Sequence, residues 1–518
     1  MGEVFFINII LLVILFIFIG WIWLVFWINA DQLEKKRNPG FWNTIAVLSG
    51  PVGCAFYLLT AQDAKARCPS CNYKLPKTKT EIVVCPKCHQ PLSTTITTHL
   101  FVEALRNFDD NSIRLIGKEV SSSLTSSTAI DNQDQWSSIR AVKMIIANAL
   151  QDRATDIHIE PEVEDLRIRY RIDGVLHEVV GPPKELQTEI VPCVKAMAEM
   201  DVAERRKPLD GRFQVEHDDR RIDIRVSTSP TIYGEKVALR LLDRKGYMLE
   251  LDTLGIQPEV LSKYRRLIER PQGMILVTGP TGCGKTSTLY SSLSTIDVKS
   301  KNVITIEEPV EYQLDGINQI PINPRADVTF ASGLRSILRQ DPDIIMVGEI
   351  RDAETAQIAI QAALTGHLIF STLHTNDSVG AIIRMMDIGV EPYLISGSVL
   401  AVLAQRLVRC ICPHCKEPDT PNPDDLEELG IPSDAKTKFA HGKGCEKCKF
   451  TGFAGRTGIF ELLLIDDSLR EMIDKKASAV SIKAYASKNG MQTLVEDGIT
   501  KAMQGITTIN EVAQAIST

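Results

Sequence analysis

The sequence predicts an α/β protein of several domains, and three observations carry this prediction. The chain has 518 residues, whereas a single domain usually has about 100–200. From Met274 onward, apolar runs alternate with helical segments, which is typical of an open, parallel α/β sheet. The glycine-rich stretch "GPTGCGKTS" directly follows the first of these runs. It therefore falls at the carboxyl end of a predicted strand, where open α/β sheets bind ligands.

Residues 1–62 form the predicted membrane anchor. Val4 to Ala30 contains no charged side chain and exceeds the about 20 apolar residues that a membrane-spanning helix needs. A cleaved signal peptide is the alternative, but no basic start and no small-residue cleavage site are evident. A second uncharged stretch, Phe41 to Gln62, permits either one crossing or a hairpin of two. The larger basic cluster that follows it favours the hairpin.

Eight of the twelve cysteines occur in four C-x-x-C pairs, which predict two structural zinc sites. Residues 63–95 are expected to form a zinc ribbon with the ligands Cys68, Cys71, Cys85 and Cys88. The second set lies in an insertion over residues 410–450 and comprises Cys412, Cys415, Cys445 and Cys448. Disulfides or redox pairs are the alternative, but a reducing cytosol disfavours them. Four cysteines close the coordination of one ion, so such a site stabilises the fold.

The rest of the chain divides into a linker and two domains. Residues 96–135 are polar and β-branched and predict a linker with at most one small element. A small α/β domain is expected over 136–245, because "LRIRYRIDGVL" and "RRIDIRVSTSP" alternate apolar and charged residues as half-buried strands do. Residues 246–518 are expected to form the larger domain, which carries the tetracysteine insertion and ends in a helical tail.

The glycine-rich stretch has the spacing of a loop that binds nucleotide phosphates. Its glycines let backbone N–H groups approach the phosphates, Lys285 can reach the β- and γ-phosphate oxygens, and Thr286 can hold Mg²⁺. The predicted nucleotide-binding residues are Gly279, Pro280, Thr281, Gly282, Cys283, Gly284, Lys285, Thr286 and Ser287.

Hydrolysis also needs a carboxylate that positions and activates water near the γ-phosphate. Glu349 follows the apolar run of "DIIMVGEIRD", with Gly348 where an ordinary Walker B motif carries aspartate. The stretch "ITIEEPVEY" offers three more candidates: Glu307, Glu308 and Glu311. Capping of neighbouring helices is the alternative role for each of them.

Two histidines, His367 and His374, flank the apolar run in "TGHLIFSTLHTND". A lone histidine at such a place is usually structural. Here the run also carries the polar residues Ser371, Thr372, Thr375 and Asn376. We therefore interpret the two histidines as phosphate sensors.

Together these segments resemble the secretion ATPase superfamily, specifically the type II secretion and type IV pilus assembly ATPases. The resemblance lies between residues 140 and 460 and rests, in family order, on "ATDIHIEP", "RYRIDG", "STSPTIYGEKVALRLLD", "GPTGCGKT", "ITIEEPVEY", "LRQDPDIIMVGEIRD", "TGHLIFSTLHTND", "RLVRCICPHC" and "GCEKCKFTGFAGRTGIFE". It implies a P-loop, RecA-like ATPase domain that acts in a homo-hexamer. It also implies that the small domain is PAS-like and closes over ATP, with ATP, Mg²⁺ and Zn²⁺ as cofactors.

The resemblance also implies roles for single residues. Three arginines match family residues that reach toward the phosphates from the small domain: Arg212, Arg225 and Arg240. "IEEPVE" resembles the family's Asp box with Glu308 in place of the commonest aspartate, so Glu311 is favoured as the water-activating residue. Glu349 corresponds to the Walker B carboxylate near Mg²⁺ and water. His367 and His374 correspond to the His box.

The predicted function is a hexameric motor, anchored in the bacterial inner membrane with its ATPase domains facing the cytoplasm. It would hydrolyse ATP to drive assembly of a type IV pilus or type II secretion pseudopilus through an inner-membrane platform protein. Retraction ATPases of the superfamily lack the second tetracysteine set, which disfavours a retraction motor. The net charge of −7 disfavours DNA transport and a nucleic-acid partner. A nucleotide-sensing membrane scaffold with little turnover is the remaining alternative, supported by the replacement at Glu308.

Overall fold

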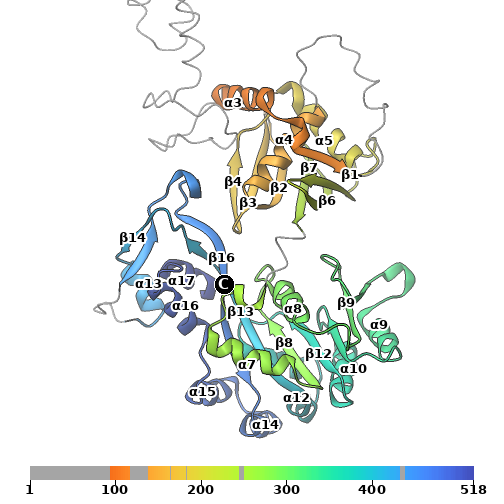
Figure 1. Cartoon of the computed structure of the whole chain (residues 1–518), viewed down its shortest axis with the longest axis vertical. Coiled ribbons are helices and arrows are strands. Elements are labelled where there is room, and N and C mark those ends of the chain that lie inside the picture. Colours follow the sequence, from red (N-terminus) through yellow and green to blue (C-terminus); the bar gives the residue numbers. More distant parts are fainter. Residues whose placement is uncertain are drawn as a thin grey trace, which may run out of the picture.

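The computed structural model shows a small and a large α/β domain (Figure 1). No helix among the described residues is long and apolar enough to cross a membrane. The predicted anchor over 1–62 and the first tetracysteine set lie outside these residues. The structure describes residues 94–116, 138–163, 165–182, 184–243, 250–431 and 438–517.

The small domain is a seven-stranded antiparallel sheet in the order β1-β5-β6-β7-β2-β3-β4, with helices packed on one face. Its strands alternate as predicted: in β3 the side chains of Leu166, Ile168 and Tyr170 are buried between outward-facing arginines. The strands are β1 (Ile113–Ile116), β2 (Ala154–Pro161), β3 (Leu166–Ile172), β4 (Val175–Val179), β5 (Leu209–His217), β6 (Arg220–Thr231) and β7 (Gly234–Asp243). The helices are α3 (Thr94–Asn107), α4 (Ser138–Gln151) and α5 (Lys184–Met197), with a 3-10 turn η1 (Asp110–Ser112).

The predicted linker over 96–135 is wrong for its first part, because α3 and β1 belong to the small domain. Leu100 and Phe101 are 1% exposed and join the core of this domain, as does Ile113 of β1. Strand β1 extends the sheet by pairing with β5. The buried residues Leu100, Phe101, Ala104 and Leu105 share one face of the helix. This amphipathic pattern was missed because the segment begins with several threonines.

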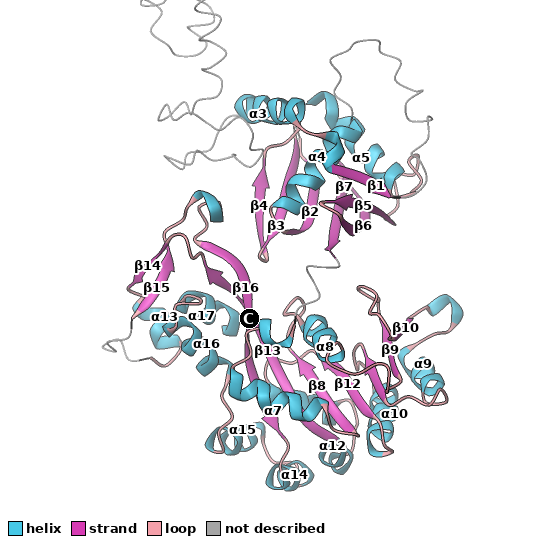
Figure 2. Ribbon diagram, viewed as in Figure 1, coloured by secondary structure: helices cyan, strands magenta, loops and turns pink. Residues whose placement is uncertain are grey.

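The large domain is built on a sheet in the order β10-β9-β11-β12-β8-β13-β16, which is parallel except for β16 (Figure 2). The four apolar runs that predicted strands are β8, β9, β11 and β12, and all of their residues are buried. Because these strands are parallel, their carboxyl ends share one edge, which we call the carboxyl edge. The strands are β8 (Gly273–Thr278), β9 (Val303–Glu307), β10 (Asn318–Pro321), β11 (Ile344–Val347), β12 (Leu368–Leu373), β13 (Val399–Ile411) and β16 (Phe453–Leu464).

Helices pack on both faces of this sheet, and the predicted helical tail follows β16 (Figure 2). Those before β13 are α7 (Pro258–Ile268), α8 (Lys285–Leu293), α9 (Phe330–Ile337), α10 (Ala353–Leu364), α11 (Ser378–Asp387) and α12 (Pro392–Ser398), with turns η2 (Leu251–Thr253) and η3 (Pro324–Ala326). The tail contains α14 (Asp467–Asp474), α15 (Ala479–Lys488), α16 (Leu494–Met503) and α17 (Ile509–Ser517).

The second tetracysteine set lies between β13 and β16, in a segment that we call the tetracysteine module (residues 412–452). It contains the antiparallel pair β14 (Lys416–Asp419) and β15 (Phe439–Gly442), the helix α13 (Pro423–Glu428) and the turn η4 (Glu446–Cys448). The module stands beside the large sheet and reaches toward the small domain (Figure 1).

Candidate functional site

The predicted phosphate-binding loop, residues 279–287, joins β8 to α8 at the carboxyl edge. Gly279 and Gly284 have φ angles of 151° and 89°, which L side chains rarely adopt. A Cβ atom at Gly279 would lie 2.5 Å from both the Cys283 sulfur and the Gln405 carbonyl oxygen. The loop can therefore keep this shape only with glycine at position 279.

Gln405 of β13 forms hydrogen bonds with the loop and with α8. The sequence analysis did not identify this residue. Its Nε2 donates to the Cys283 carbonyl at 2.7 Å, and its Oε1 accepts from the Thr288 hydroxyl at 2.7 Å. The side chain is buried, so it links the loop to the first turn of α8 without contact with water. The available signal was a glutamine inside the apolar run "VLAVLAQRLV".

Lys285 begins α8 and lies over the loop. Its amine donates to the carbonyls of Gly279 at 2.7 Å and Pro280 at 3.2 Å, and lies 3.4 Å from Nδ1 of His374. Burial lowers the pKa of Lys285, and the nearby Cys283 and Glu349 oppose this shift. His374 reaches Lys285 because it follows β12, the strand next to β8.

Glu349 lies beside His374 at the end of β11. One oxygen of Glu349 is 3.5 Å from Nε2 of His374, and the other is ion-paired with Arg351. Arg351 also binds Glu308 at 3.1 Å. Burial and then the charge of Lys285 lower the pKa of His374. A continuous polar chain therefore crosses the carboxyl edge through Glu308, Arg351, Glu349, His374 and Lys285.

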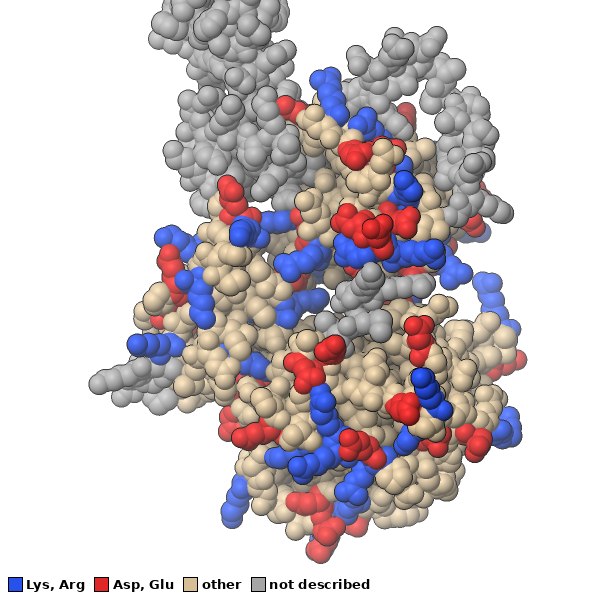
Figure 3. Space-filling view, viewed as in Figure 1, with Lys and Arg blue, Asp and Glu red and all other residues tan. Residues whose placement is uncertain are grey.

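The small domain contacts the same edge through Arg225. Its Nη1 is 3.1 Å from Glu311, and its Nη2 donates to the Val310 carbonyl at 2.7 Å. About a third of each side chain is exposed, 34% for Arg225 and 32% for Glu311. Figure 3 shows charged side chains gathered where the two domains face each other. The two domains thus meet at a carboxylate that the sequence proposed as a water activator.

The three predicted arginines form one row across the small sheet. Arg225 is the direct cross-strand partner of both Arg212 and Arg240, so all three side chains project from one face. Arg240 donates to Asp156 at 3.1 Å, and Arg212 is exposed. Like charges directly opposite each other are unfavourable in a sheet, and here the carboxylates of Glu311 and Asp156 compensate Arg225 and Arg240.

The structure separates the two histidines, and this corrects their joint interpretation as phosphate sensors. His367 precedes β12, and its Nδ1 contacts the Ala362 carbonyl at 2.9 Å, beside the end of α10. A six-residue strand is about 20 Å long, so His367 lies at the edge opposite to the phosphate-binding loop. Ser371 and Thr372 are also engaged elsewhere, since their hydroxyls donate to carbonyls of the neighbouring β11 segment at 2.8 Å and 2.7 Å.

Glu307 differs from the other three candidate glutamates because it is buried. Its carboxylate accepts from the hydroxyl of Tyr290, from the hydroxyl of Thr305 at 2.5 Å and from the amide of Gln319 at 3.0 Å. All these partners are internal. Glu307 therefore holds structure together, whereas Glu308, Glu311 and Glu349 remain accessible at the carboxyl edge.

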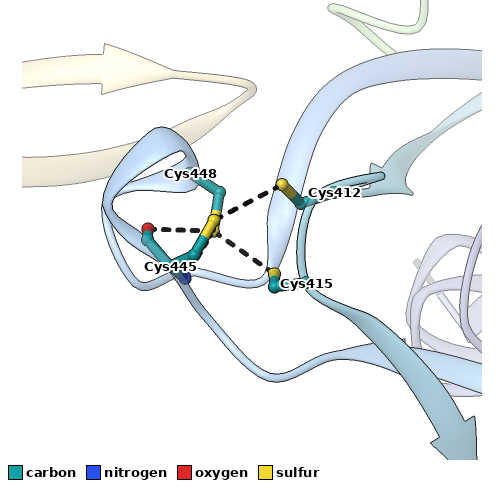
Figure 4. Close-up of side chains that lie close together, drawn as sticks. All are labelled: Cys412, Cys415, Cys445 and Cys448. Carbon is teal, nitrogen blue, oxygen red and sulfur yellow. Dashed lines mark hydrogen bonds between the residues drawn. The ribbon is translucent and has the colours of Figure 1, made fainter.

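The second tetracysteine set is assembled in the structure (Figure 4). All four sulfurs lie within 4.8 Å of one another, and three pairs are 3.7–3.9 Å apart. A tetrahedral zinc ion with Zn–S distances of about 2.3 Å requires sulfurs about 3.8 Å apart. Backbone N–H groups of Gly444 and Gly452 point at the sulfurs of Cys415 and Cys448 at 3.3 Å. The geometry and the donors both fit a thiolate-bound ion.

Comparison with known proteins agrees with this architecture. The family model for "Type II/IV secretion system protein" matches residues 131–514. The chain belongs to the type II/IV secretion system family. The predicted resemblance is thereby confirmed, and the chain is an ATP-hydrolysing enzyme of this family.

Several curated members of the type II/IV secretion system family are close to this chain. It is 48% identical over 385 residues to the type II secretion system protein E of Dickeya dadantii (strain 3937), covering 74% of this chain and 77% of the relative. It is 47% identical over 383 residues to the type II secretion system ATPase E of Vibrio cholerae, with 74% and 76% covered. The type IV pilus assembly ATPase PilB of Thermus thermophilus is 48% identical over 382 residues, with 73% and 43% covered.

Solved structures share the fold of this secretion system family. The pilus retraction motor PilT, determined with bound ADP, is 27% identical, with a TM-score of 0.50 over 72% of this chain and 95% of PilT. The Legionella pneumophila ATPase DotB is 20% identical, with a TM-score of 0.56 over 75% of this chain and 98% of DotB. The likeness to DotB concerns the fold alone. The PAS-like description of the small domain stays a prediction.

Proposed function

We propose that the chain is a motor ATPase that drives assembly of a type II secretion pseudopilus or a type IV pilus. The observation that carries this proposal is the polar chain at the carboxyl edge, with an arginine of the second domain beside it. This arrangement places Lys285 in one polar chain with several carboxylates, and the small domain contacts the neighbouring Glu311 through Arg225. The relatives named for type II secretion and pilus assembly support the same process.

Each side chain receives a role in hydrolysis. Lys285 would bind the β- and γ-phosphates, while Thr286 and Glu349 would hold Mg²⁺, which supplies charge neutralisation when bound. Glu311 would accept the proton of the attacking water as the bond between the γ-phosphorus and the bridging oxygen breaks, giving ADP and phosphate. The phosphates would compete with Glu311 for Arg225, so their arrival would release the carboxylate for this task. Arg212 and Arg240 would extend the phosphate-binding surface.

The cofactor and partner assignments complete the proposal. Zn²⁺ is the ion proposed for the tetracysteine module, because four thiolates in a closed set suit it. Residues 1–62 would anchor the chain in the inner membrane, and a zinc ribbon at 63–95 would follow the anchor. Hexamer formation and contact with a platform protein are proposed from the type of relatives that the chain matches.

The test is Mg²⁺-dependent ATP turnover by the full-length protein, with its oligomeric mass measured in parallel. Glu349→Gln and Glu311→Gln should each lower kcat by about 10²–10⁴-fold, the usual contribution of acid–base groups. Glu354→Gln is the matched control, because this exposed glutamate on α10 pairs with Arg335, outside the polar chain. Nucleotide binding without turnover by the assembled wild type would contradict the motor and favour a nucleotide sensor.

A further inference from the structure

Tyr290 lies in α8, between the phosphate-binding loop and the candidate glutamates. Its side chain is buried, at 1% exposure, and its hydroxyl stands at the centre of a polar network. The hydroxyl donates to Glu307 and accepts from the amide of Gln319 at 3.3 Å and from the backbone N–H of Glu311 at 3.4 Å. A single oxygen atom thus contacts three separate parts of the large domain.

These contacts connect α8 with the segment that follows β9, and hydrolysis requires a fixed distance between the two. Helix α8 starts at Lys285, and Glu307 ends β9. Residues 307 and 311 are the two ends of the short segment that carries Glu308 and Glu311. Because Tyr290 contacts both ends, its hydroxyl ties this segment to the helix that begins at the phosphate-binding loop.

The surroundings hold Tyr290 in this position. The rings of Tyr290 and Tyr312 pack edge to face, with centroids 4.6 Å apart and an angle of 80° between the rings. Thr305 and Gln319 bind Glu307, so this carboxylate is a fully partnered, buried acceptor. Burial and the neighbouring charge of Glu307 raise the pKa of Tyr290 above its usual range. The phenol consequently stays a hydrogen-bond donor at physiological pH.

We propose that Tyr290 is a positioning residue that fixes Glu311 relative to the phosphate-binding loop, with Glu307 as its buried anchor. The inference rests on the proposed role of Glu311 as the group that activates water. It assigns a positioning role in hydrolysis to two buried residues, Tyr290 and Glu307. Without the hydroxyl, the segment that carries Glu311 loses its direct bond to α8.

Tyr264 of α7 provides a matched control. It is also fully buried, and its hydroxyl contacts the Ser292 hydroxyl of α8 at 3.0 Å. Burial raises the pKa of Tyr264 to about 12. Removal of its hydroxyl therefore deletes a buried phenolic hydrogen bond to the same helix, but leaves the contacts of Glu307 and Glu311 unchanged.

The experiment measures kcat and KM for ATP in the full-length wild type, Tyr290→Phe and Tyr264→Phe. A positioning role predicts that Tyr290→Phe lowers kcat about tenfold and changes KM less than about twofold, since the effect concerns the reaction and not binding. Tyr264→Phe should stay within about twofold of the wild type in both constants. In a Glu311→Gln background, Tyr290→Phe should have little further effect, because residues that act as a unit are not additive.

Equal kcat changes in the two phenylalanine variants would overturn the inference, as would an undiminished effect of Tyr290→Phe in the Glu311→Gln background. Gln319→Met is a second variant in case Tyr290→Phe does not fold, because it removes a donor to both Tyr290 and Glu307 and should lower kcat in the same way. An unchanged kcat in Gln319→Met would also contradict the inference. Absence of turnover in the wild type would instead overturn the proposed function, and this inference with it.

Discussion

The small domain contacts the large domain in two described regions, and the two contacts are built differently. At the carboxyl edge, Arg225 binds Glu311 and the Val310 carbonyl through partly exposed groups. At the tetracysteine module, Lys449 forms an ion pair with Asp152, which is only 7% exposed. The first contact consists of charges for which a nucleotide phosphate can compete. The second pairs a buried carboxylate with a lysine that is 28% exposed, and both residues are far from the loop in sequence.

The lysine of the second contact directly follows the turn η4, which carries Cys448. Lys449 and Phe450 directly follow Cys448 and have φ angles of 54° and 63°, an uncommon backbone conformation for such residues. Nearby, the backbone N–H of Gly455 donates to Asp173 at 2.8 Å. A cavity of about 460 Å³ lies between the module and the small domain. We call the second contact, between Lys449 and Asp152, the pivot, and we expect nucleotide to compete for the first contact only.

Removal of one cysteine of the tetracysteine module should have the largest effect on this pivot. Cys445→Ser removes one thiolate ligand, and binding of structural zinc contributes on the order of 10 kcal/mol to the folding of small metal modules. We expect loss of bound zinc and fast hydrogen exchange over residues 438–455, while nucleotide binding persists. Metal analysis and hydrogen-exchange mass spectrometry check this. Cys410→Ser is the control, since this half-buried thiol lies outside the set. Slow exchange without zinc would show that the module does not need the ion.

Removal of Arg225 should affect catalysis and leave the pivot intact. Arg225→Gln is expected to lower kcat by about 10²-fold, the effect of losing one charge-stabilising donor. Its effect on stability should be below about 1 kcal/mol, because the pair is partly exposed. Arg221→Gln is the matched control, because Arg221 is exposed and lies on the same strand and face, four residues before Arg225. Equal turnover in the two variants would exclude a role for Arg225 at the phosphates.

Breaking the ion pair at the pivot should have a moderate effect on stability. Lys449→Met leaves Asp152 buried without its cation, and an unsatisfied buried group costs about 1–3 kcal/mol. We expect a lower unfolding midpoint in urea and little change in kcat per folded molecule. The double variant Lys449→Met with Asp152→Leu removes both charges and should recover most of the loss. A double variant less stable than Lys449→Met would argue against this ion pair as the cause.

The sequence predicted those features that depend on local spacing. Apolar runs became β8, β9, β11 and β12, and C-x-x-C pairs placed four thiols around one point, because strand and turn geometry is set within a few residues. Features that depend on tertiary packing were not predicted. The sequence did not indicate that Glu307 is buried while Glu308 is accessible, although the alternation of a strand turns neighbouring residues to opposite sides.

The residues that were missed share this cause. Arg351 stands two positions after Glu349, but its link to Glu308 requires that β9 and β11 lie side by side. Tyr290 is one of several polar or aromatic residues in α8, and its hydrogen-bond partners Glu307 and Gln319 lie on β9 and β10. The contact between Lys449 and Asp152 joins residues almost 300 positions apart in the chain. No local pattern encodes such pairs.

The smallest expected effect is a pH dependence confined to the carboxyl edge. Burial, followed by the charge of Lys285, lowers the pKa of His374 below its usual value of 6.5, with Glu349 opposing the shift. The unfolded chain therefore binds more protons than the native chain just below pH 6.5, and stability must fall as the pH decreases through that window. His374→Asn should remove this part of the pH dependence.

Urea unfolding between pH 7.5 and 5.5 measures it, with wild type and His374→Asn compared at each pH. The two free energies of unfolding should differ by a nearly constant amount near pH 7.5, and the wild type should lose stability relative to the variant as the pH falls through 6.5. The difference will be small, because about half of the His374 side chain is exposed to solvent. Parallel curves would mean that folding does not lower the pKa of His374. The Lys449–Asp152 ion pair itself includes no imidazole, so Lys449→Met should lose as much stability between pH 7.5 and pH 5.5 as the wild type does.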